Sequence, residues 1–172
     1  MILDRAVTVL GIDPGTAVLG FGVVRSGQQR QAVLVECGVV RTRPSEALSC
    51  RLGTIFDGIC ELLERHRPDA IAVEGLFHGR NARSALILGH ARGVVLLAAA
   101  RAGLPVAEIS PAEVKRAVTG TGAATKPQVA AMVMRLLRLA SAPTPADAAD
   151  GVAIALTHLL RQQAGRTMHR TQ

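Results

Sequence analysis

The chain has very few aromatic residues. Its 172 residues include no Trp, no Tyr and only three Phe, although hydrophobic residues make up 49% of the sequence. That apolar content is enough for the core of one globular domain, and the core must consist mainly of Leu, Val, Ile and Ala. An aromatic side chain in a polar segment is therefore conspicuous, and Phe77 is in such a segment.

Cysteine is also scarce. Cys37, Cys50 and Cys60 are an odd number without CxxC spacing, which argues against a disulfide framework or a zinc site and predicts reduced thiols. Asp4 and Arg5 interrupt the short apolar start, so the pattern does not fit a signal peptide. No run approaches the about 20 apolar residues that span a bilayer. We therefore expect a cytoplasmic protein.

Positive charge is concentrated in the middle of the chain. The formal net charge is +7. Residues 75–138 hold nine basic and two acidic residues, and the rest of the chain holds eleven of each. A basic block of this kind favours a polyanionic partner such as nucleic acid. The alternative is an ordinary solvated basic surface.

Four acidic residues border apolar segments. Asp13 and Glu74 each close a hydrophobic run, and Asp147 and Asp150 lie one helical turn apart near the start of the apolar stretch 146–160. Carboxylates in apolar surroundings must be paired or coordinate a metal ion. Their hard oxygen atoms suit Mg²⁺ or Mn²⁺. The pattern predicts a divalent-metal site.

Each acid also has an ordinary structural explanation. Asp13 can be a turn residue, and Glu74 can be a solvated acid at the edge of a loop. If Thr144 caps the last helix, Asp147 falls in its first turn, where the helix dipole favours an acid. Asp150 is the hardest to explain without a ligand, because its neighbours in sequence are apolar.

The apolar periodicity predicts a single α/β domain over residues 1–164, with a disordered basic tail over residues 165–172. Ser110, Pro111 and Glu113 form the sequence pattern of a capped helix start. The predicted order is an antiparallel meander followed by parallel αβ units, which makes a five-stranded mixed sheet with helices on both faces and the first strand in the centre. The expected strands are 7–13, 18–25, 32–40, 69–74 and 105–109, and the expected helices are 45–67, 81–102, 111–120, 126–139 and 145–163.

Two further residues are candidates for contacts with a substrate. Lys126, one of only two lysines, follows a Gly/Thr loop at a helix start. It could contact the cleaved phosphate or orient water in a two-metal phosphodiester hydrolysis, or it could be an ordinary exposed residue. Phe77 lies in a glycine-containing loop, where it could stack on an unpaired base, although a lone Phe more often packs against the core.

Together these motifs resemble the RuvC-type Holliday-junction resolvases of bacteria, which have the RNase H-like fold. The resemblance extends from Val9 to about Leu160. It rests on Gly11-Ile12-Asp13-Pro14-Gly15-Thr16, Ala72-Val73-Glu74, residues 81–86, residues 89–93 and Asp147-Ala148-Ala149-Asp150.

The resemblance implies a structure-selective endonuclease that resolves four-way DNA junctions by paired symmetric nicks in homologous recombination and DNA repair. Asp13, Glu74, Asp147 and Asp150 would be the catalytic acids, holding two Mg²⁺ ions that Mn²⁺ could replace, with Lys126 as a further catalytic residue. A homodimer that acts with the RuvA and RuvB branch-migration proteins is also implied. DNA contacts are expected from Phe77, Arg80, Arg83, Lys115, Arg116 and Lys126.

Two other functions compete with this interpretation. The opening motif, residues 11–16, also occurs in actin-like ATPases, but those enzymes bind nucleotide between two duplicated domains, and this chain has one. A non-catalytic junction-binding module is the other alternative, and the presence of all four acids argues against it. For the dimer, the helix 81–102 is the expected interface, because it is too rich in apolar and small residues for a solvated surface.

Overall fold

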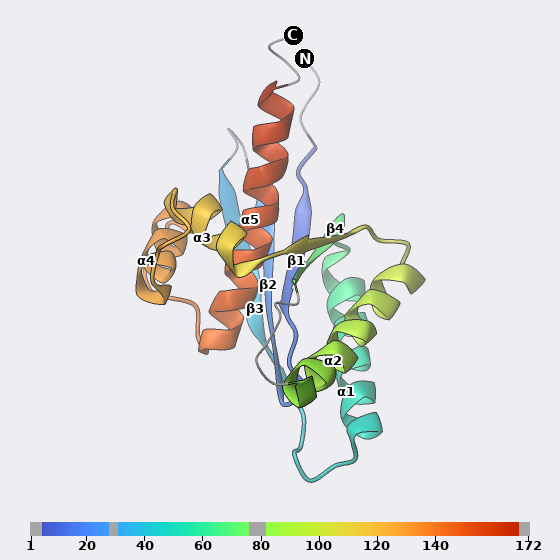
Figure 1. The fold of residues 1–172 in the computed structure, drawn as a ribbon. Helices are drawn as coiled ribbons and strands as arrows, with labels where there is room; N and C mark the ends of the chain where they lie inside the picture. The colour runs from blue at the N-terminus through green and yellow to red at the C-terminus, as the bar shows by residue number, and fades with distance from the viewer. Residues whose placement is uncertain (1–4, 28–30, 76–81, 169–172) are drawn as a thin grey trace.

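The protein is built around one mixed β-sheet (Figure 1). The computed structural model describes residues 5–27, 31–75 and 82–168, without the side chains of residues 82–84 and 166–168. The strand order is β3-β2-β1-β4-β5, with antiparallel pairing among the first three strands in sequence and parallel pairing of β1 with β4 and of β4 with β5. The predicted mixed sheet with a central first strand is confirmed. The strands are β1 Thr8–Asp13, β2 Val18–Ser26, β3 Ala32–Arg41, β4 Ala70–Glu74 and β5 Val106–Ile109.

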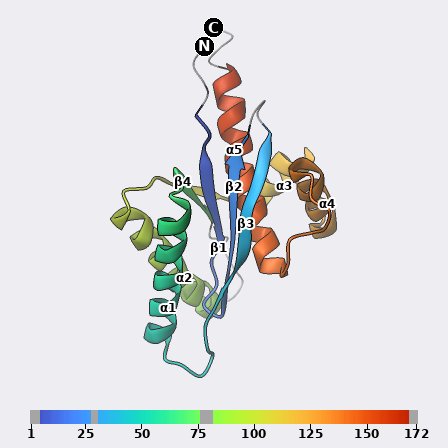
Figure 2. The same ribbon diagram turned by 180° about the vertical axis from the view of Figure 1, so that it is seen from behind.

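Helices cover both faces of the sheet, as predicted. Helices α1 and α2 lie on one face, and α3, α4 and α5 lie on the other (Figures 1 and 2). Each layer encloses its own apolar cluster, built almost entirely from Leu, Val, Ile and Ala. Among the described helices, none combines the length and the hydropathy that a membrane span requires. The bounds are α1 Leu48–His66, α2 Ala82–Arg101, α3 Pro111–Thr119, α4 Lys126–Leu137 and α5 Ala146–Met168.

The last helix differs from the prediction at both ends. It begins at Ala146 rather than Pro145, and it continues to Met168 rather than ending near Gln163. Residues 165–168 are therefore helical, contrary to the expected disordered tail, and residues 169–172 lie outside the described part of the chain. Once a helix is held by its apolar face, each further residue adds a hydrogen bond without a new nucleation step, so polar composition alone does not end it.

Glycines allow α5 to pack directly on the sheet. Gly11 and Gly22 are paired across β1 and β2, and Gly20 lies opposite Asp13. A Cβ atom on Gly20 would overlap the backbone of Asp147, and one on Gly22 would overlap the backbone of α5. The helix backbone therefore occupies the space that side chains on the two strands would fill, and this close approach sets the position of the start of α5.

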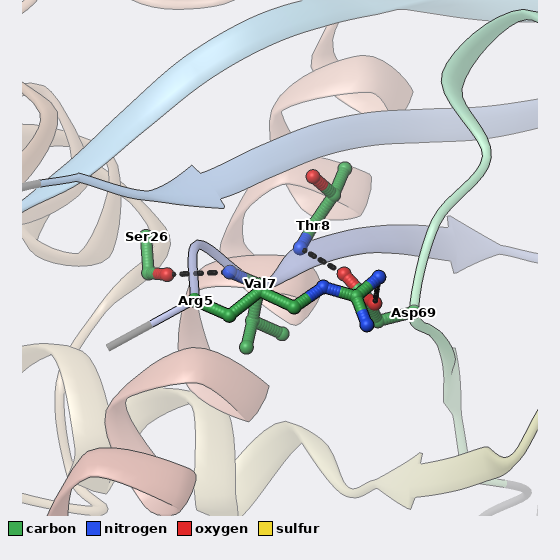
Figure 3. A network of polar contacts seen from close by, with 5 residues as sticks. All are labelled: Arg5, Val7, Thr8, Ser26 and Asp69. Carbon is green, nitrogen blue, oxygen red and sulfur yellow. Dashed lines mark hydrogen bonds and ion pairs between the residues drawn. The ribbon is translucent and has the colours of Figure 1, made fainter. Parts of the chain in front are cut away.

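A polar network anchors the other end of the central strand (Figure 3). The Asp69 carboxylate accepts a hydrogen bond from the Thr8 backbone N–H at 2.8 Å and one from the Arg5 guanidinium at 3.0 Å. The Ser26 hydroxyl accepts a hydrogen bond from the Val7 N–H at 2.7 Å. These contacts fix where β1 begins relative to β2 and β4. They thereby help to set the register of β1, in which Asp13 lies at the opposite end of the strand.

The predicted cap of α3 is confirmed. The Ser110 hydroxyl accepts a hydrogen bond from the Glu113 N–H at 3.2 Å, and the Ser110 N–H donates to the Glu113 carboxylate at 2.8 Å. Pro111 occupies the first helical position, where its missing N–H has no consequence. This reciprocal cap starts α3 immediately after β5, on the side of the sheet where α5 lies.

Candidate active site

Two of the predicted acids meet at the end of adjacent parallel strands. In the register of β1 and β4, Ile12 is paired with Val73, so the next residues, Asp13 and Glu74, emerge side by side. Each of the two carboxyl groups affects the pKa of the other. The carboxyl ends of parallel strands are the usual place for ligands in α/β sheets, and the prediction that both acids close buried strands there is confirmed.

The other two acids come from α5. Because the Asp147 backbone packs against Gly20, which lies opposite Asp13 on β2, the first turns of α5 are placed over the end of β1. The charges of Asp147 and Asp150 both act on Asp13, and the charge of Asp150 also acts on Glu74. The structure therefore brings Asp147 and Asp150 close enough to Asp13 for their charges to act on it.

Burial and mutual repulsion make Asp13 hard to ionise. Burial is the main cause, and the charges of Glu74, Asp150 and Asp147 add to it, so the pKa of Asp13 is raised to about 7. Burial also raises the pKa of Glu74, an effect that the positive charge of Lys126 opposes. Without a bound metal ion, Asp13 partly retains its proton at neutral pH, where isolated carboxyl groups would be fully ionised.

Lys126 places a positive charge beside these acids. It is the first residue of α4, and its Nζ lies 3.2 Å from Oδ2 of Asp150. This hydrogen bond is the main reason why the pKa of Lys126 is raised, and the charges of Asp150, Asp13 and Glu74 contribute. The Lys126 side chain is 84% exposed and that of Asp150 is 42% exposed. The ammonium group is thus accessible from solvent and remains positively charged at neutral pH.

A cavity of about 120 Å³ opens beside the acids, between α3, α4 and α5. Its polar side chains are those of Glu74, Asp150, Lys126 and Lys115. Both lysines of the chain therefore border one hollow next to the carboxylates. Apolar side chains line the rest, among them Val114, Val129, Val133, Ala153 and Ile154.

The structure describes only some of the other predicted DNA contacts. Phe77 and Arg80 lie outside the described residues, and the side chain of Arg83 is likewise not described. Arg116 is exposed on α3, and its charge acts on Glu113. Among the predicted basic contacts whose side chains the structure describes, Lys115 and Lys126 line the cavity at the acids and Arg116 does not.

Two kinds of residue were missed in the sequence. One is the set of glycines, of which Gly20 and Gly22 are visible in the sequence as a Gly-x-Gly pair inside an apolar strand. The other is Arg92, which is only 8% exposed and donates a hydrogen bond to the backbone carbonyl of Glu74 at 3.1 Å. Its signal in the sequence is that it is the only charged residue between positions 84 and 100.

The donor set fits a hard divalent cation. Two of the four carboxyl groups, those of Asp13 and Glu74, have raised pKa values. A bound cation would relieve the repulsion among the four negative charges, and carboxylate oxygens are ligands that suit Mg²⁺ or Mn²⁺. Among residues 5–27, 31–75 and 82–168, no three or more His, Cys, Asp and Glu side chains are arranged so that they could hold a metal ion. Asp150 is hydrogen-bonded to Lys126 instead.

Comparison with known proteins decides the family. Residues 9–158 match the family described as crossover junction endodeoxyribonuclease RuvC. The chain belongs to the RuvC family. Members of this family are metal-dependent nucleases, so the predicted family and enzyme class are confirmed.

Individual relatives agree with this assignment. The chain is 52% identical to the RuvC of Parafrankia sp. over 153 residues, covering 89% of this chain and 86% of that protein. It is 50% identical to the RuvC of Halorhodospira halophila over 159 residues, covering 92% and 93% of the two chains. Both relatives are described as crossover junction endodeoxyribonucleases.

The fold matches solved structures as well. The structure of Thermus thermophilus RuvC in complex with a Holliday junction substrate superposes with a TM-score of 0.88 and 44% identity, covering 92% of this chain and 96% of that one. The yeast mitochondrial resolvase Ydc2 shares the fold at 16% identity and a TM-score of 0.65. The predicted RNase H-like fold is therefore confirmed.

Proposed function

We propose that this protein resolves four-way DNA junctions by paired metal-assisted nicks at the site formed by Asp13, Glu74, Asp147 and Asp150. Membership of the RuvC family makes it a crossover junction endodeoxyribonuclease that acts in recombination and repair. The observation that carries the assignment of the site is the meeting of these acids at the end of β1, beside Lys126. We also propose that it acts on DNA in the cytoplasm.

The four acids are the proposed ligands of two Mg²⁺ ions, which Mn²⁺ can replace. Bound divalent ions supply charge neutralisation for an in-line displacement at phosphorus. To hold a cation, Asp13 would give up its proton, and Asp150 would give up its contact with Lys126. The acids would supply the negative charge that recruits the cations, with Asp13 and Glu74 held at strand ends and Asp147 and Asp150 held on α5.

Lys126 acts as a phosphate contact rather than as a base. Its pKa is raised by Asp150, so it holds its proton at neutral pH and cannot accept one from water. Its exposed ammonium group is suited to a phosphate oxygen at the cleaved position. If Asp150 held a cation, Lys126 would be available for that contact.

The basic residues around the cavity extend this site into a DNA surface. Lys115 lies beside Lys126 at the cavity, and we propose that both contact the phosphate backbone, whose neutralisation supplies most of the affinity of such proteins. Arg116 is exposed on α3, the helix that also holds Lys115. It is proposed to contact DNA further from the cut. Phe77, Arg80 and Arg83 complete the proposed DNA contacts.

The active form is proposed to be a homodimer that packs through α2. Leu86 is 66% exposed and Leu97 is 54% exposed, and they lie about three turns apart on one face. Gly93 lies between them, with no atom near the position of an added Cβ. This apolar, small-residue face suits close packing against a second copy, which would present two equivalent sites to a two-fold junction. RuvA and RuvB are the proposed partners.

Cleavage of a synthetic four-way junction tests the function. With Mg²⁺, the wild-type protein should nick two strands, whereas Asp150→Asn should lose nicking by about 10³-fold or more while its junction Kd stays within about threefold. Asp57→Asn, an exposed acid on α1, is the matched control and should cleave normally. Intact DNA with the wild-type protein would rule out the nuclease, and joint loss of binding and cleavage in Asp150→Asn would make Asp150 structural.

A further inference from the structure

Arg92 is a buried cation with no role in the chemistry described so far. It lies in the middle of α2, and its side chain is only 10% exposed. One guanidinium nitrogen donates a hydrogen bond to the backbone carbonyl of Glu74 at 3.1 Å, and the other forms an ion pair with the Glu108 carboxylate on β5. One side chain on α2 therefore holds the ends of two neighbouring strands.

The contact fixes a single peptide unit. The carbonyl of Glu74 and the N–H of Gly75 belong to the same planar peptide. Arg92 donates to its carbonyl, and its N–H donates to the Ile109 carbonyl at 2.9 Å. Pro14, which follows Asp13 on the neighbouring strand, has no N–H with which to extend the ladder to this carbonyl. Held at both ends, the peptide limits rotation at Glu74, and so limits where its carboxylate points.

We infer that Arg92 is a positioning residue, which sets the direction of the Glu74 carboxylate by clamping the peptide that follows it. This inference rests on the proposed function, in which Glu74 holds a cation. Arg92 contacts the backbone and not the carboxylate, so it orients Glu74 without neutralising it. Because Arg92 is on the helix proposed to form the dimer interface, it also links that interface mechanically to the site.

Removing Arg92 should impair the site more than the fold. Glu108 has a 61% exposed side chain, so water can solvate it when its partner is lost, and no unpaired charge is left buried. The Glu74 peptide, in contrast, loses the donor to its carbonyl. Groups that hold metal ligands in place typically account for 10–100-fold in metal affinity or activity.

The test compares Arg92→Met and Arg92→Lys with Arg101→Met, a matched control at the exposed end of α2. Calorimetry measures Mn²⁺ binding without DNA, and single-turnover cleavage of a saturating junction measures the rate. We expect Arg92→Met to weaken Mn²⁺ binding and slow cleavage by about 10–100-fold, with the junction Kd within about threefold of wild type. Arg101→Met should match the wild-type protein in all three.

Arg92→Lys is the second variant, and it tests the same role if Arg92→Met does not fold. It retains the positive charge beside Glu108 but replaces the guanidinium fork by one nitrogen, so a loss of Mn²⁺ affinity between those of the other two proteins is expected. Wild-type Mn²⁺ binding and cleavage in either folded variant would overturn the positioning role. A wild-type protein that leaves the junction intact would instead overturn the proposed function and, with it, this inference.

Discussion

The ionisation of Asp13 opposes the folded state of the metal-free protein. Its pKa is about 7 in the folded chain, against an ordinary value of 3.8, so the folded state binds a proton more tightly than the unfolded state does. The free energy of unfolding therefore falls as the pH rises from about 4 to about 7, and it is not lowered further by this group above that range. The site is thus a place where the arrangement needed for function reduces stability.

Asp13→Asn should stabilise the metal-free protein at pH 8 and leave it unchanged at pH 4, because Asn does not ionise. A gain of about 1 kcal/mol would raise the Tm by about 2–4 °C in a chain of this size. Because the chain lacks Trp and Tyr, far-UV circular dichroism or calorimetry is the suitable measurement. Asp57→Asn is the control, and an equal gain at both pH values would show that charge repulsion at Asp13 is not the cause.

At the scale of secondary-structure elements, the contact between α5 and the sheet determines where two of the acids lie. The backbone of α5 packs on Gly20 and Gly22 without intervening side chains. Strand β2 therefore sets the position of the first turn of α5. Any atom added at this contact must push the helix away. The position of Asp147 and Asp150 relative to Asp13 should therefore be very sensitive to these glycines.

Gly20→Ala should lower both stability and activity. The added methyl overlaps the Asp147 backbone, and overpacking of this kind costs typically 1–3 kcal/mol. Displacement of Asp147 and Asp150 should slow cleavage by about 100-fold, the usual effect of a misplacement near 1 Å. Gly53→Ala in α1 has no atom within 4 Å of its new methyl and should be neutral or stabilising by about 0.5–1 kcal/mol. Equal effects of the two substitutions, measured by chemical denaturation and nicking, would contradict this account of the contact.

At the scale of the whole molecule, two surfaces lie on opposite layers. The lysines that border the acids belong to the layer of α3 and α4, whereas the exposed apolar residues of α2 belong to the other layer. The two layers are separate in both views of the molecule (Figures 1 and 2). A second copy that packs on α2 would therefore leave the lysines accessible to DNA in each subunit.

Leu97→Glu should convert the proposed dimer to a monomer, because a charge would be buried in an apolar interface. Light scattering should report half the wild-type mass, and the monomer should nick single strands without coupling the two cuts. Val33→Glu, at a 50% exposed position on β3, is the matched control and should remain dimeric. A dimeric Leu97→Glu protein that still makes paired nicks would exclude α2 as the interface.

Much of the fold was predictable because the relevant signals are local. The uninterrupted apolar run of β1 predicted a central strand, and Ser110 with Glu113 predicted the start of α3. The four acids were recognisable because each interrupts or closes an apolar segment. Local composition failed at the end of α5, where a helix already anchored on the sheet continues through a polar segment.

The sequence by itself determined most of the elements, the central place of the first strand, the family and the four candidate acids, because periodicity, caps and motifs act over a few residues. Only the tertiary structure decided which side chains meet. Lys126 reaches Asp150, Arg92 reaches the Glu74 carbonyl, and α5 lies on Gly20 and Gly22. These contacts join residues far apart in the chain, and they depend on the distance between packed layers, a quantity that no local pattern of residues encodes.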